Sequence, residues 1–285
     1  MPATFSQSKT VARRRVSTFN MFIRAGLVLT TMLPASVLAG SALPKGLVYL
    51  RDIDPAIVQD IRYAGSHNFV GRPISGYRAA ECILSEPAAR ALEAVQRMLA
   101  RKKLSLIIWD CYRPKRAVAD FLQWSKDPAR SEMKTEFYPR TDKEKLFALG
   151  YLAKRSAHSR GSTVDLGIVP AGVSVAPPPD PAQSSKACTL PKGERFEDGT
   201  IDFGTGYDCL DVLAHTSNAV AGGMALRNRR TLSSYMERAG FRPYAREWWH
   251  FELVNEPFHR DGFDFEVSAS PSANEAPARR PQDER

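Results

Sequence analysis

Two short segments contain residue types that bind metal ions and move protons. The first runs from Ser156 to Asp165 and includes His158, and the second places Glu247 three residues before His250. Imidazole nitrogens and carboxylate oxygens are ligands that zinc accepts, and a catalytic zinc keeps an open position for water. His158, Asp165 and His250 would form such a ligand set. Glu247 would then remain free to take a proton from the attacking water.

Each of these residues also has an ordinary structural explanation. A histidine in a polar loop is often solvated or caps a helix, and Asp165 could be a turn residue. Glu247, which precedes two tryptophans, could be one end of a salt bridge. The spacing also differs from the HExxH motif, in which one helix supplies both histidine ligands. Composition and spacing alone therefore leave the metal site and the structural roles open.

A third segment, from Trp109 to Pro114, contains Arg113 at the junction of a predicted buried strand and a proline-initiated helix. Strand ends often carry catalytic groups, because the strand fixes the backbone while the side chain reaches a cleft. A guanidinium there could stabilise an oxyanion, since it stays charged and offers a planar fork of donors. The alternative is a simple ion pair with Asp110 or with a surface carboxylate.

The elements that must position these residues are short strands interspersed with helices. Periodic apolar residues and caps predict helices over 86–101, 114–122, 146–154 and 230–239, strands over 104–109 and 248–253, and a proline-rich loop over 170–199. This order lacks the regular alternation of a parallel sheet, so we expect the α+β class.

The two ends of the chain differ in composition from its middle. Residues 1–39 combine arginines with an apolar run and small residues, which predicts a cleaved signal peptide and hence a periplasmic or secreted protein. An uncleaved membrane anchor is the alternative; with the leader removed, we expect no stable membrane insertion. Residues 40–266 would form one domain. Residues 267–285 are rich in Ser, Pro, Ala and charge, which predicts a disordered tail.

The charge of the chain does not favour nucleic-acid binding. Residues 1–39 contain five basic residues and no acidic one, so removing them lowers the formal net charge from +9 to +4. The remaining basic residues are scattered along the sequence rather than concentrated in one stretch. We therefore expect no nucleic-acid partner.

Export is consistent with an even number of cysteines. Cys82, Cys111, Cys188 and Cys209 allow three pairings, between which the sequence alone does not decide. We favour Cys82–Cys111 and Cys188–Cys209, the second of which would close the proline-rich loop. Four separate buried thiols are the alternative.

Taken together, the blocks SAHSRGSTVDL, DCYRPKRAV and EWWHFEL resemble the D-alanyl-D-alanine dipeptidase family, zinc enzymes that include the vancomycin-resistance dipeptidase. The resemblance extends from about Leu47 to Phe265. It implies a small α+β domain with a central antiparallel sheet flanked by helices, shared with D,D-carboxypeptidases and the hedgehog signalling domain. It also implies zinc-dependent hydrolysis of a small substrate, D-Ala-D-Ala, in the cell envelope.

The family motifs assign roles to individual residues of this chain. In SxHxxGxxxD the histidine and aspartate bind zinc, and in ExWH the glutamate is the base and the histidine the third ligand. The resemblance thus implies one zinc ion per chain on His158, Asp165 and His250, with Glu247 as catalytic base. It further implies that Arg113 stabilises the transition state. Finally, it places three residues next to the substrate: Asp208 at its amino group, Tyr151 and Ser156.

Two other functions remain open at this stage. A D,D-carboxypeptidase that trims peptidoglycan stem peptides would share the metal ligands and differ in the pocket for the amino end. Here the Ser-His pair of the family is replaced by Ala214-His215, which affects that pocket. A zinc-binding recognition domain without turnover would need neither Glu247 nor Arg113. The sequence does not determine the oligomeric state.

Overall fold

The computed structural model describes residues 42–173, 186–260 and 262–274. The predicted leader, residues 1–39, lies outside them. The strands are β1 (Leu47–Tyr49), β2 (Val58–Gln59), β3 (Ile83–Ser85), β4 (Leu104–Asp110), β5 (Thr163–Pro170), β6 (Phe241–Tyr244) and β7 (Glu247–Leu253). The α-helices are α1 (Leu50–Ile53), α2 (Glu86–Ala100), α3 (Lys115–Ser125), α4 (Lys134–Phe137) and α5 (Gly223–Arg238).

Five of the strands form one sheet in the order β2-β4-β5-β7-β6, while β1 and β3 form a separate antiparallel pair. Every neighbouring pair of the large sheet is antiparallel except β2 and β4, which are parallel. The expectation of a purely antiparallel sheet is therefore wrong at this edge. The connection from β2 to β4 includes helix α2, the kind of crossover that a parallel pair requires. Helices and strands thus form a mixed α/β arrangement.

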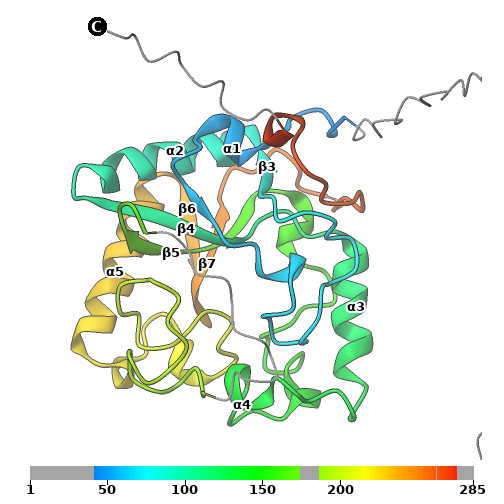
Figure 1. The fold of residues 1–285 in the computed structure, drawn as a ribbon, viewed down its shortest axis with the longest axis vertical. Helices are drawn as coiled ribbons and strands as arrows, with labels where there is room; N and C mark the ends of the chain where they lie inside the picture. The colour runs from blue at the N-terminus through cyan, green and yellow to red at the C-terminus, as the bar shows by residue number, and fades with distance from the viewer. Residues whose placement is uncertain (1–41, 174–185, 261, 275–285) are drawn as a thin grey trace, which may run out of the picture. The chain divides into compact units, whose positions relative to one another are not determined.

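Two of the predicted helices form where their apolar periodicity placed them. Helix α2 has Pro87 in its first turn and buries Leu92, Val95 and Leu99 on one face. Helix α3 begins directly after Pro114 and buries an equivalent face. Figure 1 shows α3 and α5 on opposite sides of the sheet. None of the helices in the described ranges has the length and apolar character needed to cross a membrane.

Two other helix predictions need correction. Helix α5 begins at Gly223, earlier than the predicted residue 230. The predicted helix over 146–154 is absent, and the chain forms turns there instead. Gly150 has a φ of 78°, a left-handed conformation that a right-handed helix cannot contain. Leu146, Tyr151 and Leu152 are buried by this turn, whereas Leu149 is exposed.

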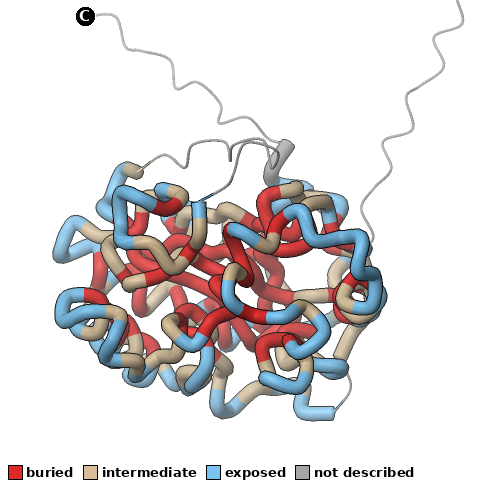
Figure 2. The backbone as a smooth tube through the Cα atoms, turned by 90° about the horizontal axis from the view of Figure 1, so that it is seen from below, coloured by how far each residue is buried: buried red, intermediate tan, exposed pale blue. Residues whose placement is uncertain are grey.

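The core lies around the central strands β4 and β5. The residues from Ser105 to Asp110 and from Thr163 to Val169 are all buried, so both faces of these strands are covered. Figure 2 shows the buried segments in the interior and the exposed ones at the periphery. Side chains at the ends of these two strands are therefore held by the most tightly packed part of the protein.

Two disulfides connect the four cysteines. Cys82 is bonded to Cys111, directly after β4, and Cys188 is bonded to Cys209. This is the pairing that the sequence analysis favoured, and the described residues contain no free cysteine. Structural disulfides persist in oxidising compartments, which places the protein outside the reducing cytosol.

The chain remains ordered beyond residue 266. Val267 is buried, forms a bridge with Tyr77 and exchanges a backbone hydrogen bond with Gly76. Ser270 is also buried, and its hydroxyl donates to Asp52. The prediction of a disordered tail from residue 267 is therefore wrong for 267–270, because these residues contribute to the packing. Residues 275–285 lie outside the described part of the chain.

Candidate active site and metal centre

Three neighbouring strands each bring one side chain into a single row across the sheet. Asp165 on β5 pairs with His250 on β7 and, on its other side, with Asp110 at the end of β4. The register of β4 shifts after Ile108, so that Trp109 is an additional residue without a partner on β5. Such a β-bulge re-aims the residue that follows it. Because directly opposite residues project from the same face of a sheet, the bulge places Asp110 beside Asp165.

The side chain of the bulged Trp109 supports this row from behind. Trp109 is buried and stacks on Tyr207, with ring centroids 4.6 Å apart. A Cβ atom at Gly167 would come within 2.7 Å of the indole, so the close approach requires a glycine in β5. The Tyr207 hydroxyl in turn donates to Asp165 Oδ2 at 3.3 Å. The bulge therefore positions Asp110 directly and Tyr207 through its stacking on Trp109, and both lie next to Asp165.

His158 reaches the same point from a short 3-10 helix, Ala157–Arg160, that precedes β5. The Ser156 hydroxyl accepts a hydrogen bond from the backbone N–H of His158 and caps this helix. The imidazole Nδ1 lies 2.7 Å from the backbone oxygen of Cys111. Because a carbonyl only accepts hydrogen bonds, Nδ1 carries the proton. The lone pair of Nε2 therefore points toward the row on the sheet.

Three donor atoms converge at this point. His158 Nε2 lies 3.3 Å from both Asp165 Oδ1 and His250 Nδ1. The remaining distance, between Asp165 Oδ1 and His250 Nδ1, is 3.1 Å. Ligands held about 2.0–2.1 Å from a zinc ion at tetrahedral angles lie roughly 3.3 Å from one another. The three residues therefore fit one divalent ion with its fourth position open. They are the predicted ligand set.

The electrostatics of this group favour a bound cation. Burial raises the pKa of Asp165, but the two imidazoles beside it outweigh burial and lower it overall. Burial lowers the pKa of His250, yet hydrogen bonds to Asp165 and Glu252 outweigh this effect and raise it to about 10. A metal ion would compete with the proton on His250, so the affinity for the metal should decrease as the pH is lowered.

Glu252 supports His250 from outside the row. Its carboxylate Oε1 lies 3.6 Å from His250 Nε2, the ring nitrogen that faces away from Asp165. Hydrogen bonding to His250 lowers the pKa of Glu252 to about 2, so Glu252 is ionised. A carboxylate at this position fixes the orientation of a histidine ligand and makes its other nitrogen a better donor.

Glu247, the predicted base, lies beside the convergence point without belonging to it. Its Oε2 lies 3.6 Å from His250 Nδ1, and the side chain is mostly buried. Burial, aided by the negative charge of Asp165, raises the pKa of Glu247 to about 8. A cation on the three ligands would lower this pKa again, because a positive charge favours the carboxylate form. Glu247 can thus accept and return a proton near neutral pH.

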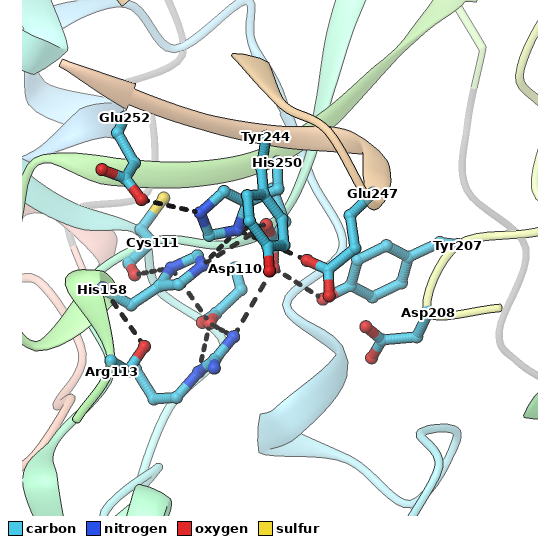
Figure 3. Close-up of polar contacts among 12 residues, drawn as sticks. Asp110, Cys111, Arg113, His158, Tyr207, Asp208, Tyr244, Glu247, His250 and Glu252 are labelled. Atoms are coloured by element: carbon cyan, nitrogen blue, oxygen red, sulfur yellow. Dashed lines mark hydrogen bonds and ion pairs between the residues drawn. The ribbon is translucent and has the colours of Figure 1, made fainter. Parts of the chain in front are cut away.

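Arg113 lies between Asp110 and the cavity. Its Nε and Nη2 donate to Asp110 Oδ2 at 2.8 and 2.7 Å, so it forms the ion pair that was the alternative prediction. The same Nη2 lies 3.5 Å from Asp165, and the side chain lines the cavity over the three donor atoms. Figure 3 shows Arg113 extended beneath His158. The pair with Asp110 holds the guanidinium at the site.

A cavity of about 290 Å³ opens over the convergence point. Its lining includes all of the predicted catalytic and substrate-binding residues: Arg113, Glu247, Tyr151, Ser156 and Asp208. Tyr151 Oη lies 3.2 Å from His215 Nε2, so the histidine of the altered Ala214-His215 pair contacts the cavity wall. The structure thus brings the predicted residues into one open cavity large enough for a small ligand.

Asp208 is the most constrained residue of this cavity. It has a φ of 54°, which is unusual for a residue other than glycine, and it is buried. Tyr63 donates a hydrogen bond to Asp208 Oδ2 at 2.8 Å. Burial, together with the charge of Asp165, raises the pKa of Asp208 well above its ordinary value. A cationic group arriving in the cavity would reverse this shift by forming an ion pair.

The sequence matches a family model described as D-ala-D-ala dipeptidase over residues 44–175 and 174–268. The chain belongs to the D-ala-D-ala dipeptidase family. A D-alanyl-D-alanine dipeptidase from Enterococcus faecalis is 33% identical over 224 residues, which cover 79% of this chain and 99% of the relative. One from Streptomyces coelicolor is 33% identical (77% and 97% covered), and one from Escherichia coli 30% (78% and 93% covered).

The peptidases of the D-ala-D-ala dipeptidase family are metal-dependent, which agrees with the close group of His158, Asp165 and His250. The matched residues include all five strands of the large sheet and every residue of the cavity. The family model and the site therefore refer to the same part of the chain.

Sequence reasoning missed two residues of this dipeptidase-family site. Tyr63 contacts Asp208 from a distant part of the chain, and no local pattern indicated this contact. Glu252 could have been found, because it follows His250 by two residues on strand β7. Residues two apart on a strand share a face, so alternation already places a carboxylate beside the ligand.

Proposed function

We propose that this protein hydrolyses the dipeptide D-Ala-D-Ala with one zinc ion held by His158, Asp165 and His250. The observation that carries the proposal is the convergence of three donor atoms beside the buried carboxylate of Glu247. Membership of the family and the names of the relatives support the substrate. When bound, a zinc ion supplies a more acidic water and polarises the scissile carbonyl.

Glu247 acts as the proton carrier of the reaction. As a carboxylate it accepts a proton from the attacking water, and its raised pKa then lets it pass that proton to the leaving amine. Its burial also keeps bulk water from competing for the proton. A bound cation nearby keeps the resting form ionised, so the carboxylate is ready at neutral pH.

Arg113 stabilises the negative charge that develops on the carbonyl oxygen. Asp110 holds the guanidinium through two of its nitrogens, and Tyr77 donates to the other oxygen of Asp110 at 2.6 Å. This support means that little reorganisation is needed when the charge appears. Loss of one such donor typically lowers the rate by about 10²- to 10³-fold.

Asp208 binds the free amino group of the dipeptide, with Tyr151 and Ser156 lining the same cavity. A buried carboxylate with a raised pKa lacks a positive partner, and the ammonium group supplies one. A longer peptide would replace that ammonium with an amide and leave Asp208 without a counter-charge. The cavity therefore favours a free dipeptide over a peptide chain.

The two competing functions differ from this proposal in measurable ways. A D,D-carboxypeptidase would cleave a stem pentapeptide at least as well as the dipeptide, so both substrates should be assayed side by side. A recognition domain without turnover would not need Glu247 or Arg113, and both line the cavity. The fold kinship with D,D-carboxypeptidases and hedgehog domains belongs to the proposal as well.

We also propose that the reaction takes place in the cell envelope. The composition of residues 1–39, which predicts a signal peptide, and the two disulfides support export. An exported enzyme would meet D-Ala-D-Ala released by cell-wall turnover, and hydrolysis would recover D-Ala. Sequencing the amino terminus of the mature protein tests this part separately.

The decisive experiment is the Glu247→Ala variant prepared with zinc. We expect kcat for D-Ala-D-Ala to fall by about 10³-fold because the proton carrier is lost. Metal analysis of the same sample should give one zinc per chain, since Glu247 is not among the three ligands. Turnover close to that of the wild type would contradict the mechanism. A panel of Ala-Ala stereoisomers then tests whether the D,D form is preferred.

A further inference from the structure

A second, larger cavity lies next to the active site. This groove has a volume of about 750 Å³ and is lined by residues of α3, by residues between Lys154 and Arg160, and by His259, Arg260 and Gly262. Val118, Arg155, Ser156 and Arg160 line both the groove and the catalytic cavity. A ligand in the groove would therefore lie directly beside the entrance to the active site. Hydrolysis of a small dipeptide does not require such a space.

The groove is strongly basic. Five cationic side chains line it: Lys115, Lys154, Arg155, Arg160 and Arg260. Within the described ranges, no aspartate or glutamate lines the groove. Five cationic side chains around one groove attract an anionic ligand, because the low-dielectric walls of a groove concentrate the electric field of the charges.

Most of these cations also lack partners of their own. Arg160 is paired with Glu256 at 2.7 Å. By contrast, the side chains of Lys115, Lys154, Arg155 and Arg260 form no ion pair or hydrogen bond with any other described residue. Elsewhere on α3, the neighbouring Arg116 is fully engaged with Asp264 and Glu266. The groove thus brings four unpaired cations into one cavity.

The groove contains a second polar feature that lacks a partner. Ser159 is only 3% exposed, and its hydroxyl has no hydrogen-bond partner among the described residues. Buried hydroxyl groups are nearly always paired, so an unpaired one beside a cavity points to a ligand atom. On the opposite wall, Val118, Ala119 and Leu122 of α3 give an uncharged surface. The groove therefore offers cationic, hydrogen-bonding and apolar contacts together.

We propose that this groove binds a linear phosphodiester polymer. Its phosphates would pair with the lysines and arginines, and its uncharged units would pack on α3. Guanidinium groups match phosphate oxygens in geometry, and a phosphodiester keeps one negative charge per repeat. The cations come from three separate segments, so the groove is far larger than one phosphate requires. Bound there, the polymer would hold the enzyme in place with its active site open.

The lining argues against nucleic acid as the polymer. Proteins that bind single strands stack the bases on aromatic side chains. No Phe, Tyr or Trp lines the groove among the residues that the structure describes. A polymer built on a small alcohol, such as glycerol, needs no aromatic side chains for stacking. The apolar surface of α3 is enough to pack against its uncharged units.

The test measures binding of a fluorescent, short poly(glycerol phosphate) to the purified full chain by anisotropy over a range of salt concentrations. The test variant is Lys154→Glu/Arg260→Glu, two exposed residues that line the groove and not the catalytic cavity. The matched control is Arg101→Glu/Arg238→Glu, which makes the same change in net charge at exposed positions outside the groove. Thermal unfolding checks that both variants are folded.

We expect salt-dependent binding to the wild type, a loss of about tenfold or more in the groove variant, and a change below about twofold in the control. The slope of log affinity against log salt should fall in magnitude by roughly 1.4 in the groove variant, because two phosphate contacts are lost. Absence of binding at low salt, or an equal loss in both variants, would overturn the proposal. Equal binding of polyglutamate would overturn the phosphodiester assignment, and tighter binding of an oligonucleotide would reassign the groove.

Discussion

The proposed metal ligands and the proposed substrate-binding residues are held in different ways. Asp165 and His250 lie on adjacent paired strands, where backbone register fixes their positions. Tyr151, Ser156 and Asp208 all lie outside strands and α-helices. Metal coordination tolerates little displacement, and strands supply rigid positions. Substrate selection is adjusted more readily on loops, because insertions there leave the core intact.

Each half of the site nevertheless has a covalent anchor of its own. The Cys82–Cys111 disulfide immobilises the residue whose carbonyl accepts the hydrogen bond of His158. The Cys188–Cys209 disulfide anchors the residue that directly follows Asp208, the residue with the unusual backbone conformation. The two halves are thus fixed separately, and changes in one should leave the other largely intact.

Among the variants that distinguish the two halves of the site, Arg113→Lys should have the largest effect on kcat. Lysine keeps the charge but loses the planar fork that spans Asp110 and the cavity. We expect kcat to fall by about 10²- to 10³-fold with unchanged zinc content, measured by steady-state kinetics and metal analysis. A rise in KM alone would place Arg113 in the substrate half instead.

A smaller effect is expected from Asp208→Asn in the substrate half. The amide keeps the shape and can still accept from Tyr63 but offers no charge to the amino group of the dipeptide. We expect kcat/KM to fall by about 10²-fold, mainly through KM, because a buried charge pair is lost. Zinc affinity, measured by competition with a chelating dye, should not change. A parallel loss of zinc would show that the halves are coupled.

The two disulfides allow a matched comparison. They join residues 29 and 21 positions apart, so their removal should destabilise the fold by similar amounts, about 3 kcal/mol each. Cys82→Ala/Cys111→Ala should raise the zinc dissociation constant about tenfold, because the support of His158 is loosened. Cys188→Ala/Cys209→Ala should instead raise KM about tenfold.

Both double variants need to be assayed at a temperature where circular dichroism shows them folded. The informative outcome is the crossed pattern: zinc affinity changes in one variant and KM in the other. If each variant changes both quantities equally, separate anchoring of the two halves is wrong.

The smallest effect is expected at Asp211, three residues after Asp208. Burial raises the pKa of Asp211, but hydrogen bonds from Arg140 and the Leu213 backbone outweigh it and lower the pKa below 3.8. A carboxyl group whose pKa is lower in the folded than in the unfolded state stabilises the fold at any pH above its unfolded-state pKa. This contribution is lost as the pH falls through its folded-state pKa. Asp211→Asn should therefore destabilise the protein by about 1 kcal/mol at neutral pH.

This difference should shrink as the pH falls below 3.8, which denaturant unfolding of both proteins across pH would detect. Asp142→Asn serves as a control, since Asp142 forms an exposed pair with Lys145 outside the cavity. A constant difference between wild type and Asp211→Asn at all pH values would contradict the assignment to the ionised carboxyl group.

The sequence predicted the elements with strong local signals. Helix α2 follows from the spacing of its apolar residues and Pro87, and strand β4 from its continuous apolar run. Residue types and family motifs indicated the candidate site. What they could not indicate depends on long-range register. The two-residue strand β2 is too short for any periodicity, and the bulge at Trp109 exists only relative to β5.

Non-local contacts explain the remaining differences. The buried position of Ser270 depends on Asp52, about two hundred residues earlier, so composition alone suggested a tail. The segment over 146–154 has helix-like spacing, but Gly150 turns the chain. Tyr63 meets Asp208 only because the fold brings distant segments together. For Ser270 and Tyr63, a partner far along the chain outweighed the local pattern; in 146–154, the conformation of one glycine did.

The unmatched Trp109 in β4 has a consequence for how this gene can change. If β4 continued past Ile108 in an unbroken ladder, Trp109 would lie opposite Asp165 and Asp110 would turn to the other face of the sheet, away from the site. A strand without the bulge could still fold and still look like its relatives. Among natural sequences of the same architecture, the spacing at this position should therefore separate working peptidases from inactive descendants more sharply than the identity of any single side chain.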